Sequence, residues 1–182
     1  MLLAFGVSGL VPNMFQLLLE RGISEQRATS TLAAMAFSIT GGRVLSGYLL
    51  DRFWAPLVCA VLVVPAVLAL LLLGIPHVGA AAVVGVVVTL GLVAGAEFDL
   101  VAYMTARYFG QRHFSELYGI QYAAFGVGAG GAPAAYGALH DAWGSYDLLI
   151  QLSVVMMLLA LGMTITLGSY PRQHELRTGQ GD

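Results

Sequence analysis

The stretch that decides the fold is WAPLVCAVLVVPAVLALLLLG, residues 54–74, which contains no charged residue. An apolar run of about 18 residues or more predicts a helix that crosses a membrane. Pro56 and Pro65 do not exclude this helix, because neighbouring helices can satisfy the backbone groups that a proline frees. The chain has 182 residues, of which 58% are hydrophobic and 10% are charged. Since a soluble domain needs a charged surface, the sequence predicts an integral membrane protein.

Five further apolar segments lie on either side of this run. Each ends at a polar, glycine or proline break such as Glu20-Arg21-Gly22, Asp51-Arg52 or Ile75-Pro76-His77. We expect the chain to turn at His140-Asp141 and from Gly144 to Asp147. The predicted fold is therefore an all-α polytopic membrane domain over residues 1–170 with a polar tail at 171–182. The six transmembrane helices are expected at about 2–19, 28–50, 54–74, 80–106, 115–139 and 148–169.

The arginines give the orientation of the chain in the membrane. One set of loops and the tail hold five of them, Arg52, Arg107, Arg112, Arg172 and Arg177. The loops on the opposite side hold only Arg21 and Arg27. Because basic residues concentrate in cytoplasmic loops, we expect both termini to lie in the cytoplasm.

The sequence shows no signature of an enzyme. The chain has no lysine and one cysteine, Cys59, which lies in an apolar run and is expected to be a buried thiol. No His/Cys metal spacing, phosphate-binding loop or activated nucleophile is present, and no basic patch suggests nucleic acid. We therefore expect no catalytic residue, no metal site and no cofactor. The four histidines, which fall in predicted loops or the tail, are His77, His113, His140 and His174.

Three ionisable residues lie deep inside predicted spans, and each is a functional hypothesis because a charge in lipid is costly. Arg43 lies eight residues before Asp51, which places it ~12 Å from the cytoplasmic edge and near the midplane. Asp99 lies at a similar depth, and Glu97 is ~3 Å deeper. The two carboxylates are ~200° apart around their helix, so they cannot face the same partner.

Two interpretations of these charges remain open. Arg43 could form a permanent ion pair that only locks two helices together. Alternatively, it faces a water-filled path and binds an anion, since its planar fork matches a carboxylate. Of Glu97 and Asp99, one is expected to pair with Arg43, and the other could carry a proton.

Other polar and small residues within the spans could likewise serve either helix packing or transport. Asn13 and Gln16, after Pro12, could contact a substrate or form hydrogen bonds between helices. We group Tyr122 with them as a candidate substrate-binding residue. The glycines of the fourth and fifth spans, Gly91, Gly95, Gly126, Gly128, Gly130 and Gly131, could serve static packing or a sliding contact.

The second and fifth spans resemble each other weakly. Ala36-Phe37, Gly41-Gly42, Gly47 and Asp51 are echoed by Ala124-Phe125, Gly130-Gly131, Gly137 and Asp141. These spans are the second members of two three-helix groups. Such an echo is typical of transporters built from inverted repeats.

The segment Gly47-Tyr48-Leu49-Leu50-Asp51-Arg52 resembles the Gly-x-x-x-Asp-Arg loop signature of the major facilitator superfamily. That family has twelve helices in two six-helix halves, and the signature follows the second helix of each half. The resemblance covers nearly the whole chain and implies that it is the C-terminal half, a 3+3 inverted repeat. We expect Gly47, Asp51, Arg52 and Arg107 to form a conformational latch. In this latch Asp51 contacts Arg107, because both lie at the cytoplasmic ends of helices that run in parallel.

Two stretches narrow the resemblance to the oxalate–formate antiporter and monocarboxylate transporter branch. Gly42-Arg43-Val44-Leu45-Ser46-Gly47 is similar to its eighth helix, where an arginine four residues before this glycine contacts the substrate carboxylate. Residues 95–110 and Tyr118-Gly119 resemble the tenth-to-eleventh helix region of bacterial members. The fifth span lacks the basic residue of some oxalate carriers, which puts a dicarboxylate substrate in doubt.

The sequence thus predicts secondary transport of a small organic anion, such as a monocarboxylate, by alternating access in the bacterial inner membrane. The expected partners are the lipid bilayer, the substrate, a proton, and a missing N-terminal half or a second copy. We expect the chain to be a fragment, because hydrophobic sequence begins at Met1 with no leader. The alternatives are efflux of apolar compounds, which would make Arg43 structural, and a non-transporting membrane module.

Overall fold

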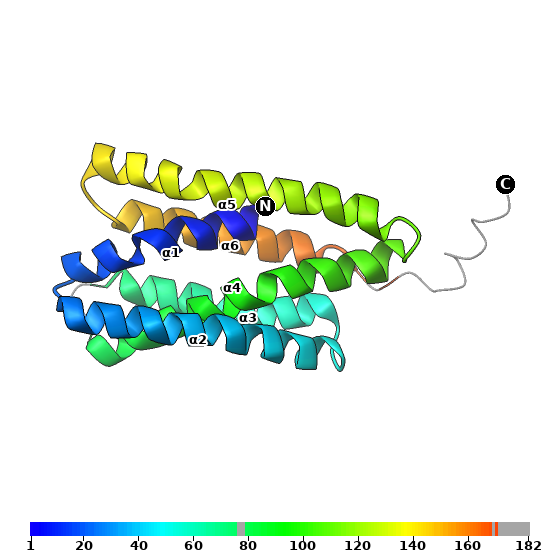
Figure 1. Ribbon diagram of the computed structural model, residues 1–182, viewed down its shortest axis with the longest axis horizontal. Coiled ribbons are helices and arrows are strands. Elements are labelled where there is room, and N and C mark those ends of the chain that lie inside the picture. The colour runs from blue at the N-terminus through cyan, green and yellow to red at the C-terminus, as the bar shows by residue number, and fades with distance from the viewer. Residues whose placement is uncertain (76–78, 169, 171–182) are drawn as a thin grey trace, which may run out of the picture.

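A computed structural model of the protein describes residues 1–75, 79–168 and 170, which form an all-helical bundle (Figure 1). Six helices run alternately up and down the bundle, and no strand occurs among the described residues. The expected break at Pro76-His77 and the tail from residue 171 lie outside them. The helices are α1 Leu2–Glu20, α2 Glu25–Leu50, α3 Ala55–Leu73, α4 Ala80–Phe109, α5 Phe114–Trp143 and α6 Asp147–Ile165.

The packing of the helices has an internal symmetry. Helix α1 packs against α5 and α6, and α4 packs in the same way against α2 and α3. The third helices of the two groups, α3 and α6, pack against each other. If α1, α2 and α3 are replaced by α4, α5 and α6 respectively, and the reverse, the same set of contacts is obtained. The corresponding helices α1 and α4 run in opposite directions (Figure 1). The contacts are those of two inverted three-helix groups.

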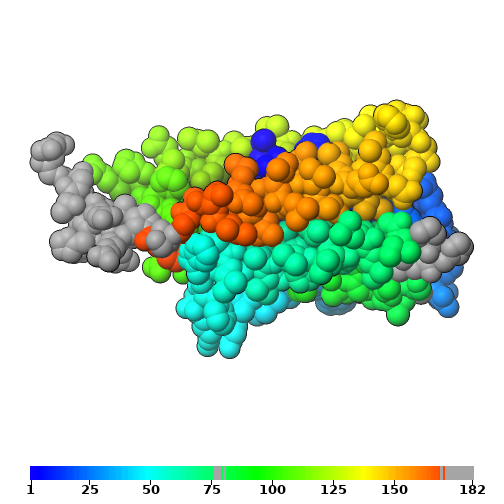
Figure 2. All heavy atoms as spheres, turned by 180° about the vertical axis from the view of Figure 1, so that it is seen from behind, coloured from blue at the N-terminus to red at the C-terminus, as the bar shows by residue number. Residues whose placement is uncertain are grey.

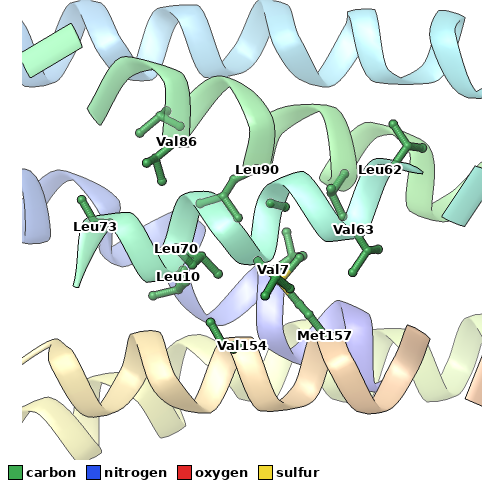
Figure 3. Close-up of a cluster of buried hydrophobic side chains, with 14 of the residues drawn as sticks. Val7, Leu10, Leu62, Val63, Leu70, Leu73, Val86, Leu90, Val154 and Met157 are labelled. Atoms are coloured by element: carbon green, nitrogen blue, oxygen red, sulfur yellow. The ribbon is translucent and has the colours of Figure 1, made fainter. Parts of the chain in front are cut away.

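The apolar core lies among α1, α3, α4 and α6 (Figure 3). Its side chains are almost completely removed from solvent, and Cys59 on α3 is buried with them. Side chains labelled in the figure are Val7, Leu10, Leu62, Val63, Leu70, Leu73, Val86, Leu90, Val154 and Met157.

The opposite faces of α3 and α6 are apolar as well but exposed. Figure 2 shows these helices side by side on one surface of the bundle. Exposed large apolar residues on them include Leu57, Val61, Leu68, Leu158 and Met163. Leucine and valine on both faces of a helix indicate contact with lipid on the outer face. The protein is therefore a multi-pass membrane protein.

Four helices, α1, α3, α4 and α6, are long and apolar enough to cross a membrane. Helices α2 and α5, with 26 and 30 residues, are also long enough to cross a membrane, but they are less hydrophobic than the other four. Polar residues and glycine lower their hydropathy, and both lie beside apolar helices. Six membrane crossings are thus expected from length, and four are supported by composition as well.

Four expected helix bounds differ from the structure by three residues or more, including that of the fourth helix, which ends at Phe109 rather than 106. The fifth helix continues through His140-Asp141 and ends at Trp143, where Gly144 takes a left-handed conformation with φ 68°. The sixth ends at Ile165 rather than 169, and the second begins at Glu25 rather than 28. His140-Asp141 does not end the helix, because polar residues can continue it and the left-handed Gly144 ends it. The imidazole Nε2 of His140 lies 3.0 Å from Glu20 Oε1 on α1.

Polar contacts join the end of α1, the end of α5 and the start of α6 at one end of the bundle. Besides the Glu20–His140 contact, Arg21 forms an ion pair with Asp147 at the start of α6. The His140 ring lies 4.2 Å from that of Tyr146. Burial raises the pKa of Tyr146, and the carboxylates of Glu20 and Asp141 raise it further. The Tyr146 hydroxyl therefore stays protonated at neutral pH.

Three glycines allow α2 and α4 to approach each other closely. A Cβ on Gly91 would lie 2.8 Å from the Met35 carbonyl oxygen, closer than real side chains allow. A Cβ on Gly95 would overlap the Ile39 carbonyl, and one on Gly42 would lie 2.8 Å from the Leu92 Cα. Gly91 and Gly95 therefore serve close packing, whereas the α5 glycines Gly126, Gly130 and Gly131 face open space.

We predict that Gly95→Ala lowers the free energy of unfolding by about 1–3 kcal/mol, because the added methyl must displace the backbone of α2. Gly130→Ala is the matched control, since its methyl meets no atom within 4 Å. The control should change stability by less than about 1 kcal/mol, with alanine favouring the helix. Thermal unfolding of both variants in lipid nanodiscs measures the difference. Equal stability of the two variants would contradict the close α2–α4 contact.

Candidate functional site

A cavity of about 370 Å³ opens between α1, α2, α4 and α5. Its walls are mostly apolar, with valine, isoleucine, alanine and proline side chains. Two ionisable groups interrupt them, Arg43 from α2 and Glu97 from α4. A pocket of this size with an apolar lining and few charged groups is typical of small-molecule sites. The remaining lining residues are Val7, Ser8, Val11, Pro12, Ile39, Ala94, Phe98, Phe125, Ala129 and Pro133.

Arg43 reaches the cavity because its helix lies directly against α4. A Cβ on Gly95 would come within 3.2 Å of the Arg43 backbone nitrogen, so the two helices touch at this level. The side chain is exposed, and its guanidinium carbon lies 5.8 Å from the centre of the Phe98 ring. Within the described part of the chain, no carboxylate lies within ion-pair distance of Arg43. The expected ion pair of Arg43 with Glu97 or Asp99 is therefore not formed in this structure.

Glu97 is almost completely buried, with only 4% of its surface exposed, yet it lines the cavity. Of the residues that the structure describes, none donates a hydrogen bond to its carboxylate or pairs with it. A buried carboxylate without a donor is costly unless water or a ligand meets it. The open side of Glu97 is the cavity.

Asp99 faces a different space, as the ~200° separation from Glu97 predicts. Its Oδ2 accepts a hydrogen bond of 2.9 Å from the Ser46 hydroxyl on α2. It lines a second cavity of about 370 Å³ together with Gly47 and Asp51 of α2. The other walls are α4, with Tyr103, the loop after it, with Gln111, and the start of α5, with Phe114.

The structure does not bring Asn13, Gln16 or Tyr122 to the wall of the cavity. The Asn13 side-chain amide donates to the carbonyl of Gly9 in its own helix at 2.9 Å. Gln16 is exposed on α1. The Tyr122 ring is exposed but lies 5.9 Å from that of Phe98, which does line the cavity. The Asn13 amide is thus engaged by its own helix rather than by the cavity.

The four predicted latch residues lie at one end of the bundle without an ion pair between them. The guanidinium of Arg52 lies 3.8 Å from the Tyr48 ring. That of Arg107 lies 4.9 Å from the Tyr170 ring and 5.8 Å from that of Tyr103. No ion pair joins Asp51 to Arg107 among residues 1–75, 79–168 and 170, so the expected contact is absent in this conformation.

Sequence reasoning missed the aromatic wall of the cavity. Phe98 and Phe125 lie with their ring centres 4.4 Å apart, one from α4 and one from α5. Both belong to spans rather than to the membrane interface, where aromatic residues usually gather. Their positions deep in the spans, with Phe98 directly between two carboxylates, are the signal that could have identified them.

Comparison with known protein families identifies one family for this chain. The sequence profile of the Major Facilitator Superfamily matches residues 1–181. The chain belongs to the major facilitator superfamily. A search of curated proteins finds no match to the chain. Members of the superfamily are membrane transporters rather than enzymes, so membrane transport of a small molecule follows from the family.

Proposed function

We propose that the chain forms the substrate-binding half of a secondary transporter for small organic anions, chiefly monocarboxylates. The observation that carries this proposal is the guanidinium of Arg43 on the wall of the cavity, which pairs with no carboxylate among the described residues. A guanidinium in a largely apolar pocket attracts a carboxylate, which it can bind through two parallel hydrogen bonds. The similarity of residues 42–52 to the oxalate–formate antiporter and monocarboxylate transporter branch supports the same ligand.

The cavity lies where a second half could close it. The α2 and α5 faces next to it expose large apolar side chains, with Phe37 81% exposed and Val127 74% exposed. Exposed apolar surface on a folded domain often marks an interaction site. We propose that another six-helix half, either an N-terminal one or a second copy, covers these faces. The two halves would rock around the cavity in alternating access.

The proposed orientation follows from the arginines, with both termini in the cytoplasm and all six helices spanning a bacterial inner membrane.

The remaining candidate residues have proposed roles as well. The substrate contacts, in a conformation in which the second half has closed over the cavity, include Asn13, Gln16 and Tyr122. Glu97 and Asp99 are the proposed sites of charge or proton coupling, by symport or by exchange. Each is a carboxylate that lines a cavity, which supports this assignment.

We predict that Arg43→Gln abolishes binding of monocarboxylates such as lactate and formate, while the protein still inserts and folds. Arg43→Lys keeps the charge but loses the planar fork, so binding should weaken by about tenfold or more. Equilibrium binding of radiolabelled lactate, formate and oxalate to the chain assembled with its second half measures the effect. Affinities are normalised to folded protein.

Arg27→Gln is the matched control, because Arg27 is an exposed arginine at the start of the same helix, outside the cavity. It should bind monocarboxylates as the unmodified protein does. Unchanged carboxylate affinity in Arg43→Gln would overturn the proposal and favour efflux of apolar compounds, with Arg43 as a packing residue. A fall in folded yield in both Arg43 variants, with full binding by Arg43→Lys, would also argue for a purely structural arginine.

The second prediction concerns the latch residues Gly47, Asp51, Arg52 and Arg107. We propose that Asp51 pairs with a cation in one conformation of the transport cycle and is free of Arg107 in the other, which is the arrangement seen here. Asp51→Asn should therefore shift the balance between inward-open and outward-open states more than it changes substrate affinity. Accessibility of introduced cysteines from each side of the membrane measures the balance. If the introduced cysteines are equally accessible in Asp51→Asn and in the unmodified protein, Asp51 is not part of a conformational latch.

A further inference from the structure

The wall of the cavity carries one basic and one acidic side chain, and these two do not pair with each other. Arg43 contributes one positive charge from α2, and Glu97 contributes one carboxylate from α4. Neither touches an oppositely charged group among the residues described here. Both groups line the same space of about 370 Å³. The two opposite charges therefore remain available to a ligand that enters between them.

A simple anion can pair with Arg43 but not with Glu97. Its carboxylate would pair with Arg43, but it would bring a second negative charge into a cavity that already contains Glu97. Like charges in a site with low dielectric repel strongly, and the Glu97 carboxylate would still have no partner. A ligand that binds well must bring a positive group to Glu97 together with a carboxylate to Arg43.

The aromatic wall can hold such a positive group. Phe98 lies 5.8 Å from the Arg43 guanidinium carbon and 4.4 Å from the Phe125 ring, and both rings line the cavity. The face of an aromatic ring attracts ammonium and quaternary ammonium groups. The same rings supply apolar contact for the short carbon chain between two charged ends.

We propose that the substrate is a zwitterion, a small monocarboxylate that also carries an ammonium or quaternary ammonium group. Its carboxylate binds Arg43, and its cationic end binds Glu97 beside Phe98 and Phe125. This inference rests on the proposed function and narrows it, since it selects amino acids and betaines among the monocarboxylates. Glu97 is then a specificity-determining residue that discriminates against simple anions.

The test is a binding series in which only the charge pattern of the probe changes. The probes are glycine, β-alanine, 4-aminobutyrate and 5-aminopentanoate, with their trimethylammonium analogues, their parent carboxylates and their parent amines. The series varies the distance between the two charges. Binding is measured calorimetrically on the chain assembled with its second half in nanodiscs and is normalised to folded protein.

We expect at least one zwitterion to bind at least about tenfold more tightly than both its parent carboxylate and its parent amine. Glu97→Gln should remove this preference, leaving affinity for the parent carboxylate equal or higher. Glu97→Asp, which keeps the charge on a shorter side chain, should retain part of it or favour a longer probe. Glu116→Gln removes an exposed carboxylate outside the cavity and should leave the preference unchanged.

The outcomes separate this inference from the function on which it rests. If carboxylates bind through Arg43 as tightly as every zwitterion, the inference fails while anion transport stands, and Glu97 then accepts a proton instead. A zwitterion preference that survives Glu97→Gln also overturns the inference, because another group must then hold the cation. If no probe with a carboxylate binds in an Arg43-dependent way, the proposed function and the inference fail together.

Discussion

The backbones of α2 and α4 meet at Gly42, Gly91 and Gly95, and this contact determines where the charged groups lie. Arg43 follows Gly42, and Glu97 comes two residues after Gly95, so the small residues that let the helices touch also place the charges. A bulkier residue at any of these glycines would push the helices apart. The backbone positions from which Arg43 and Glu97 reach the cavity are therefore set by the packing of the two main chains.

The helices are of two kinds, four that are strongly apolar and two that are less hydrophobic. Helices α1, α3, α4 and α6 are apolar enough to anchor the chain in the membrane and to build the core (Figure 3). Helices α2 and α5 are less hydrophobic, lie beside this core, and contribute Arg43 and Phe125 to the cavity. Polar groups can exist at this depth only where they line a cavity or are packed inside protein. The lower hydropathy of α2 and α5 is thus linked to the site that they form.

Much of the helical fold could be predicted from sequence, because apolar length is a strong and local signal. The end of α5 could not, because polar residues such as His140 and Asp141 can continue a helix, and Gly144 ends it instead. For the site, helix depth and periodicity singled out Arg43 and Glu97 and separated Glu97 from Asp99. Three other features depend on how the helices rotate against each other. They are the lack of an ion pair at Arg43 among the described residues, the aromatic wall, and the absence of Asn13 and Gln16 from the cavity. Single-helix patterns do not contain that information.

The most direct test of this account is a double-mutant cycle between Arg43 and Glu97, measured as the affinity for the tightest-binding carboxylate ligand. Arg43→Lys and Glu97→Asp weaken each group without removing its charge, so all four proteins should remain able to bind. If both residues act on one ligand in one cavity, their effects should be coupled by about 0.5–3 kcal/mol. Additive effects, with coupling below about 0.3 kcal/mol, would show that the two residues do not share a ligand and would contradict the account.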